Sequence, residues 1–103
     1  MSGFALHPEA YEDIDEIRAY IAEDNPGAAD RVVNEIFDCI RSLAKLPNQG
    51  FRRPSLTSLP LRFMLVREYL IAYAPESEPL WVVAVIHGRR SPRVIAALLR
   101  GRA

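Results

Sequence analysis

The residues best suited to chemistry stand near the end of this sequence, in VVAVIHGRRSPRVIAALLR, residues 82–100. A run of apolar residues stops at His87, and Gly88, Arg89 and Arg90 follow it. Histidine can transfer a proton near neutral pH, and arginine binds phosphate or carboxylate through paired hydrogen bonds. The cluster could therefore act on a phosphate or bind an anionic partner. A lone histidine at the end of a strand, however, more often has a structural role.

The charges of the sequence are balanced in number but separated along the chain. Residues 1–40 hold ten acidic residues and two arginines, a net charge of −8. Residues 41–103 hold eleven basic and three acidic residues, a net charge of +8, and twelve of all thirteen basic residues are arginine. Two interpretations stay open. The two charged surfaces solvate their own elements and pair with each other, or the second half faces an anionic partner.

Length and composition exclude several classes of protein. A chain of 103 residues, half of them hydrophobic, predicts one globular domain over residues 1–103. No run approaches the ~18 apolar residues of a membrane span, and the start of the sequence lacks the pattern of a signal peptide. Cys39 has no cysteine partner, so we expect a cytoplasmic protein. With one cysteine and two histidines we expect no structural zinc, and no cofactor.

Two helices are expected to form a hairpin in the acidic half of the chain. Pro8 opens the first, over residues 8–23, and apolar residues recur in it at spacings of three and four. Asn25 caps the second and Pro26 occupies its first turn. Its apolar stripe ends at Leu46-Pro47 and consists of Ala29, Val32, Val33, Ile36, Ile40, Leu43 and Ala44. His7, before the first helix, is expected to form a local hydrogen bond.

The basic half changes to the period of strands. Residues 51–60 are expected to form an irregular basic loop, and strands are expected over residues 61–66, 69–73 and 80–86. The last of these lacks polar alternation, which indicates a central strand. A short first strand, residues 3–7, should lie beside it, and Ser91-Pro92 should open a final helix to about residue 100. Gly88 is expected to free the backbone to leave the sheet.

The expected fold class is α+β. The element order β-α-α-β-β-β-α predicts a two-layer sandwich in which the helical hairpin packs on a small, mainly antiparallel sheet. Tyr69 and Tyr73 alternate within a strand and are expected to be core residues. Trp81, near the start of the central strand, is expected to be core first and an interface anchor second.

At this level of detail the chain resembles the RelE/ParE superfamily of toxins from bacterial type II toxin–antitoxin systems, over nearly its whole length. The resemblance is carried by five stretches in the family's order: Leu6-His7-Pro8-Glu9-Ala10, Asn25-Pro26, Leu46-Pro47, Tyr69-Leu70-Ile71-Ala72-Tyr73 and Val85-Ile86-His87-Gly88-Arg89-Arg90. The resemblance implies one of two activities on one fold. RelE-like members cut messenger RNA on the ribosome, and ParE-like members poison DNA gyrase. Both are held silent by a small antitoxin.

For the nuclease activity, the resemblance places Arg62 and Arg89 or Arg90 at positions of phosphate-binding arginines. His87 could supply a base, although it precedes the arginines rather than following them. RelE-like enzymes carry a catalytic tyrosine or histidine just after the strand tip, and here that stretch reads Ser91-Pro92-Arg93-Val94. A proton-transfer group is therefore missing. This departure favours the ParE-like branch, in which no catalytic residue is needed.

The resulting prediction is a ParE-like toxin that poisons DNA gyrase and is neutralised by a ParD-like antitoxin in a hetero-oligomer. A RelE-type endoribonuclease and an inactive antitoxin-binding module remain the alternatives. We expect no sequence-specific DNA binding by the chain itself and no membrane association. The basic tail, from Arg89 to Arg100 and Arg102, is expected to face the partner. The residues predicted to bind antitoxin or target are Arg52, Arg53, Arg62, Arg67, Arg89, Arg90, Arg93 and Trp81.

Overall fold

The computed structural model describes residues 3–102, so the predicted domain limits at residues 1 and 103 lie outside the described residues. In chain order the elements are β1 (Phe4–Leu6), α1 (Pro8–Ala22), α2 (Pro26–Lys45), the 3-10 turn η1 (Pro47–Gln49), β2 (Arg62–Val66), β3 (Tyr69–Ala74), β4 (Leu80–His87) and α3 (Pro92–Arg102). The predicted order and the α+β class are confirmed, with small shifts of the boundaries. Among the described helices, none is both long and apolar enough to cross a lipid bilayer.

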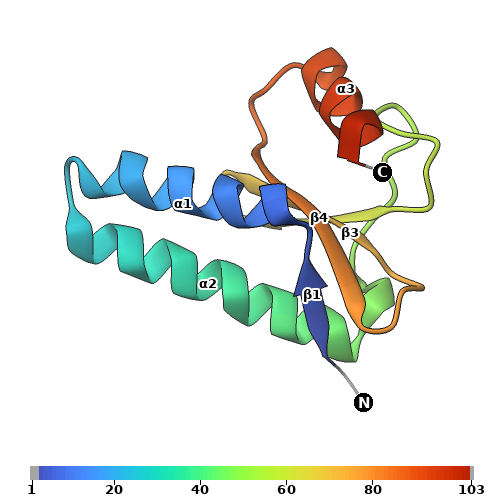
Figure 1. Ribbon diagram of the computed structural model, residues 1–103, viewed down its shortest axis with the longest axis horizontal. Helices are drawn as coiled ribbons and strands as arrows, with labels where there is room; N and C mark the ends of the chain where they lie inside the picture. Colours follow the sequence, from blue (N-terminus) through green and yellow to red (C-terminus); the bar gives the residue numbers. More distant parts are fainter. Residues whose placement is uncertain (1–2, 103) are drawn as a thin grey trace.

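The helical hairpin begins at caps that the sequence encodes locally. His7 Nδ1 accepts a hydrogen bond of 3.0 Å from the backbone N–H of Glu9, which satisfies one free donor at the start of α1. Asn25 Oδ1 accepts one of 3.0 Å from Ala28 N at the start of α2. The predicted cap at Asn25 and the local hydrogen bond expected for His7 are thus confirmed. Figure 1 shows the two helices side by side and antiparallel.

The sheet of the described residues has the strand order β1-β4-β3-β2. Strands β2, β3 and β4 form the antiparallel meander, and β1 pairs with β4 in parallel, as predicted. The pairing of β1 covers only residues 80–82 of the eight-residue strand β4. The rest of β4 therefore continues beyond its neighbour on that side of the sheet.

Each face of the sheet packs against a different layer. The hairpin covers one face, in a core that consists of Leu6, Ala10, Ile14, Ile17, Val32, Val33, Ile36, Ile40, Leu43, Tyr69, Ile71, Tyr73, Leu80, Val82 and Val85. Helix α3 and the loop after η1 cover the other, with a core of Leu56, Leu61, Phe63, Leu70, Ala72, Val83, Ala84, Ile86, Ile95 and Leu99. In Figure 1, α3 and this loop lie together, away from the hairpin. The predicted burial of the central strand on both faces is confirmed.

An irregularity in β4 decides which side chains reach the hairpin. Across β3, Ala72 pairs with Ala84 but the next residue pairs with Val82, so one residue of β4 is extra. Val83 and Ala84 consequently both pack on the α3 side. Beyond them Val85 returns to the hairpin face. Without this bulge, strict alternation would place His87 on the α3 face.

Candidate functional site

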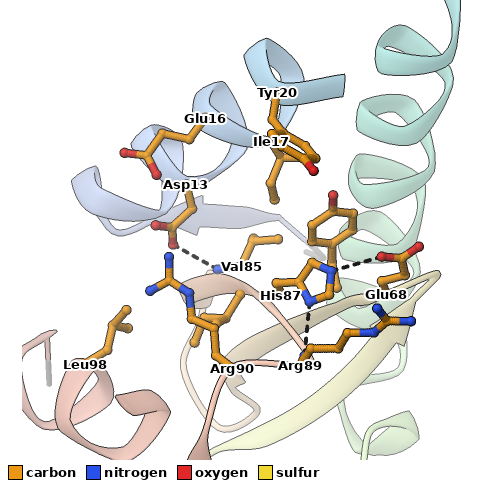
Figure 2. A pocket seen from close by; sticks show the side chains of 12 residues that line it. Asp13, Glu16, Ile17, Tyr20, Glu68, Val85, His87, Arg89, Arg90 and Leu98 are labelled. Atoms are coloured by element: carbon orange, nitrogen blue, oxygen red, sulfur yellow. Dashed lines mark hydrogen bonds and ion pairs between the residues drawn. The ribbon is translucent and has the colours of Figure 1, made fainter. Parts of the chain in front are cut away.

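A groove of about 540 Å³ lies between α1 and the end of β4. Figure 2 shows the side chains that surround it. They are Asp13, Glu16, Ile17 and Tyr20 from α1, Glu68 and Tyr69 from the start of β3, Val85, Ile86 and His87 from β4, Arg89 and Arg90 from the turn, and Leu98 from α3. The groove has the size of an ordinary ligand site, with acidic side chains on the α1 wall and basic ones at the strand tip.

His87 stands at the centre of this groove with both ring nitrogens occupied. Its Nδ1 accepts a hydrogen bond of 3.0 Å from the backbone N–H of Arg89, and its Nε2 lies 2.9 Å from Glu68 Oε2. The acceptor role of Nδ1 places the proton of the neutral ring on Nε2, where it donates to the carboxylate. The ring also packs edge-on against Tyr69, with 5.4 Å between ring centroids. These contacts fit the structural role expected for His87.

The two tyrosines of β3 are core residues, as predicted. Tyr69 and Tyr73 are buried, and burial is the main cause that raises the pKa of each phenol above its ordinary value of 10.0. The hydroxyl of Tyr73 also donates to Pro47 O at 2.6 Å and accepts from Gly50 N at 3.0 Å. A phenol with a raised pKa and a fixed hydrogen-bond role is a poor proton donor near pH 7.

Arg89 and Arg90 project from the end of β4 and are exposed. Within residues 3–102 neither forms an ion pair with a carboxylate. Arg93, in the first turn of α3, is exposed as well. The three guanidinium groups are thus available to a partner's carboxylates or phosphates.

The expectation for Gly88 is wrong. Its φ is not positive, so the chain does not use the conformational freedom of glycine to leave the sheet. Gly88 N instead donates to Glu68 O at 2.6 Å and extends the pairing of β3 and β4 by one residue. A Cβ atom at this position would lie 3.1 Å from the same oxygen, so glycine serves a close backbone approach.

Arg102 corrects the prediction that the whole basic tail faces a partner. Its side chain is 9% exposed and turns inward to Asp13, with nitrogen–oxygen distances of 2.5 and 2.9 Å. It also donates to Val83 O at 3.2 Å. Asp13 in turn accepts from Val85 N at 3.0 Å. The hydrogen bond to Asp13 raises the pKa of Arg102. Arg102 and Asp13 together cover part of the β4 edge that β1 leaves open.

The remaining predicted residues lie away from the groove. Arg67 forms two hydrogen bonds, of 2.8 and 2.7 Å, with the carboxylate of Glu35 on α2. Arg62 donates to Gly50 O at 2.8 Å and is half-buried. Trp81 lies near the start of β4, at the opposite end from the arginine pair, and is half-buried beside the α3-side core.

The two arginines of the basic loop differ slightly in their surroundings. Arg52 is exposed, and Arg53 is half-buried with its guanidinium 6.0 Å from the ring centroid of Phe51. Neither residue lines the groove, as far as the described residues define it. The structure therefore gathers Arg89 and Arg90 at one site and leaves Arg52 and Arg53 on another surface.

Sequence reasoning missed the α1 wall of the groove. Asp13, Glu16, Ile17 and Tyr20 stand three and four residues apart, so they share one face of the helix. Tyr20 is 73% exposed although it lies beside the buried stripe. This spacing was the available signal, because it places an aromatic residue and two acidic residues together beside the apolar stripe of the helix.

The fold and the groove together define a class of protein: a small α+β chain with a helical hairpin on a meander sheet and arginines at the strand tip. The model of one protein family, the ParE toxin of the type II toxin–antitoxin system parDE, matches residues 4–92 of this chain. The chain belongs to this family and is a ParE-type toxin of a ParDE toxin–antitoxin system, so the predicted ParE branch is confirmed.

A solved structure has the same fold. A chain of the chromosomal ParDE TA system from P. aeruginosa superposes with a TM-score of 0.70 at 20% sequence identity. The alignment covers 84% of the present chain and 96% of the other. Among curated proteins, no relative matches significantly.

Proposed function

We propose that this toxin arrests growth by binding DNA gyrase, without catalysis of its own, and that a cognate ParD-like antitoxin neutralises it in a hetero-oligomer. Membership of the ParE toxin family supports the proposal. The observation that carries it is the pairing of His87, whose ring nitrogens are both engaged while Arg89 and Arg90 beside it are exposed. A surface that offers free arginines, and whose histidine already uses both ring nitrogens in hydrogen bonds, is suited to binding rather than to proton transfer.

In this proposal the antitoxin occupies the groove between α1 and β4. Ile17 and Tyr20 offer apolar contacts on one wall, and Arg89 and Arg90 offer cations at the strand tip. An acidic tail with interspersed apolar residues fits such a surface, because carboxylates pair with the arginines while the apolar side chains leave water.

The proposed gyrase-binding surface includes arginines outside the groove. Arg52 and Arg53 belong to the loop that packs with α3, and Arg93 begins that helix. Arg62, Arg67 and Trp81 contribute less in this proposal, since each is half-buried or paired within the chain.

The target is tested by inducing the toxin in a bacterial host. We expect growth arrest with a DNA damage response, and gyrase–DNA cleavage complexes that can be trapped from the arrested cells. Coexpression of the antitoxin, sought in the neighbouring reading frame, should restore growth. Cuts in ribosome-bound messenger RNA in phase with codons would contradict the proposal and indicate an endoribonuclease. Absence of growth arrest would indicate an inactive antitoxin-binding module.

The arginine pair is tested with a charge-matched control. Replacing Arg89 and Arg90 together by alanine should weaken antitoxin binding or toxicity at least tenfold. Replacing Arg31 and Arg41, two exposed arginines of α2, removes the same charge from the hairpin and should change neither. Both double variants should keep the free energy of unfolding within about 1 kcal/mol of the parent, because surface substitutions cost little. Equal toxicity and affinity in the two variants would show that the pair is ordinary surface.

A further inference from the structure

We propose that the outer face of α3 binds the phosphate backbone of DNA without sequence preference, through Arg93 and Arg100. This contact depends on the proposed action against DNA gyrase, and it adds that the toxin touches the DNA held by the enzyme as well as the enzyme itself. Helix α3 lies on the side of the sheet away from the acidic hairpin (Figure 1). Neither Arg93 nor Arg100 lines the groove described above.

The period of α3 separates a buried side from an arginine side. Ile95 and Leu99 are 2% and 0% exposed and pack on the sheet. Arg93, Ala97 and Arg100 follow one another at spacings of four and three residues, so they share one face of the helix. All three are exposed. The two arginines therefore extend away from the core of the protein.

The charge along this face has one sign. Residues 79–103 contain five arginines and no acidic residue. Within the part of the chain that the structure describes, neither Arg93 nor Arg100 forms an ion pair with a carboxylate. Asp13 of the hairpin binds Arg102, which follows Arg100 by two residues and so lies on the opposite side of the helix. The hairpin thus neutralises the buried side of α3 and leaves its outer face positive.

The composition of the outer face favours DNA over a protein surface. Protein interfaces are centred on aromatic and aliphatic anchors that become buried. Among the described residues, the exposed aromatic side chains belong to α1 and to the start of the basic loop, and α3 adds only Val94 beside its arginines. Binding to a phosphate backbone needs cations and no such anchor, and guanidinium groups form paired hydrogen bonds with phosphate oxygens.

The separation of the two arginines suits a duplex. Seven residues of an α-helix advance by about 10 Å, and DNA carries one negative charge per about 1.7 Å of its axis. Each guanidinium can therefore meet a phosphate of its own. Phosphate contacts carry no sequence information, so the expected binding is non-specific.

A second copy of this chain fits the face less well. In a two-fold dimer the same surface of both copies meets, and two positive faces of α3 would repel each other. A contact between α3 of one copy and the acidic hairpin of the next is attractive, but it is head-to-tail and builds rings or filaments. Such assemblies have masses that distinguish them from a toxin bound to DNA.

The test measures binding of the purified toxin to a fluorescently labelled DNA duplex of arbitrary sequence, by anisotropy over a range of salt concentrations. Replacing Arg93 and Arg100 together by alanine should weaken binding about tenfold and reduce the slope of log affinity against log salt by about two, because two phosphate contacts are lost. Alanine preserves the helix. The control replaces Arg31 and Arg41 of α2 by alanine, removes the same charge, and should leave the DNA affinity unchanged.

Measurements on gyrase distinguish the DNA contact from the proposed function. Binding to gyrase in the absence of DNA should be equal for the parent and the double variant of α3, whereas fewer gyrase–DNA cleavage complexes should be trapped with the variant. Equal DNA affinity of parent and variant, or no DNA binding by either, would overturn the inference while the proposed function stands. Loss of gyrase binding in the absence of DNA would assign the face to the enzyme and overturn the inference as well.

The remaining outcomes concern other partners. Tighter binding of an RNA duplex than of the DNA duplex would overturn the inference in favour of RNA. Salt-sensitive self-association of the free toxin in light scattering, lost in the double variant, would assign the face to a second copy. If the parent toxin does not bind gyrase, the proposed function fails, and the anisotropy measurement still decides whether α3 binds DNA.

Discussion

At the residue scale, His87 connects three parts of the chain at the end of β4. Its ring binds the carboxylate of Glu68, accepts from the backbone of Arg89 and packs on Tyr69. A residue in this position stabilises the turn that presents the arginines. Because both ring nitrogens form these hydrogen bonds, neither is free to accept a proton from a substrate.

Replacement of His87 by glutamine should therefore retain toxicity. Glutamine preserves hydrogen-bonding capacity, and the loss of two partly exposed bonds should lower the free energy of unfolding by about 1 kcal/mol. Growth arrest after induction is the measurement, with circular dichroism to confirm folding. Complete loss of growth arrest in a folded variant would show that His87 acts in catalysis.

The hydroxyl of Tyr73 should contribute more to stability than that of Tyr69. The Tyr73→Phe variant leaves Pro47 O and Gly50 N without their partner inside the protein, which should cost about 2–4 kcal/mol. Tyr69→Phe keeps the buried ring and should cost less than about 1 kcal/mol. Urea denaturation of both variants measures the difference, and equal costs would contradict the assigned role of Tyr73.

The two tyrosines also predict how stability depends on pH. Burial raises the pKa of Tyr69 and of Tyr73 above 10.0, so the folded protein holds both phenol protons more tightly than the unfolded chain. Their contribution is complete below about pH 10 and is lost as the pH rises through the folded pKa. Urea denaturation at about pH 8 and about pH 11 should show a smaller decrease for Tyr69→Phe than for the parent. An identical decrease in the variant and the parent would show that the phenol of Tyr69 does not cause the loss of stability at high pH.

At the scale of elements, the joint between η1 and the sheet depends on Gly50. Gly50 is buried between the ring of Tyr73 and the backbone of β2. An added Cβ atom would lie 2.6 Å from the carbonyl of Phe63, closer than nonbonded atoms approach. The loop of residues 51–61 therefore starts from a fixed point.

Gly50→Ala should lower the free energy of unfolding by about 2 kcal/mol or more, because backbone or ring must move. Gly101→Ala is the matched control. Gly101 lies in α3 with no atom near an added Cβ, so this change should raise stability by about 0.5–1 kcal/mol. Thermal or urea unfolding of the two variants should therefore shift in opposite directions. A common direction would contradict the contrast between a packed and an open site.

At the scale of the whole molecule, ion pairs join the two oppositely charged parts of the chain. Arg67 binds Glu35 of α2, and Arg102 binds Asp13 and Glu9 of α1. The pair of Arg67 is exposed and contributes little stability. The ion pair between Arg102 and Asp13 is largely buried, and it joins α3 to the hairpin.

Arg102→Ala should destabilise the protein by about 3 kcal/mol, because it leaves the carboxylate of Asp13 largely buried without its cation. Arg100→Ala, which removes an exposed arginine of the same helix, should change stability by less than about 0.5 kcal/mol. Urea denaturation at neutral pH compares the two. Equal stabilities would show that the buried pair does not hold α3 in place.

The sequence by itself determined the elements and their layers. Caps, prolines and the 3.6-residue period of the hairpin act over a few residues, so His7, Asn25 and the apolar stripe of α2 could be interpreted without coordinates. The apolar run of β4 likewise predicted a central strand. These features depend on neighbours along the chain.

Only the tertiary structure decided the site. The bulge at Val83 places His87 on the hairpin face, and it appears only in the register of β4 against β3. Asp13 and Arg102, which lie 89 residues apart in the sequence, bind each other. Strand β1 pairs with only the first part of β4, so one stretch of the β4 edge stays open. Such contacts follow from register and from distances between remote segments, which no local pattern encodes.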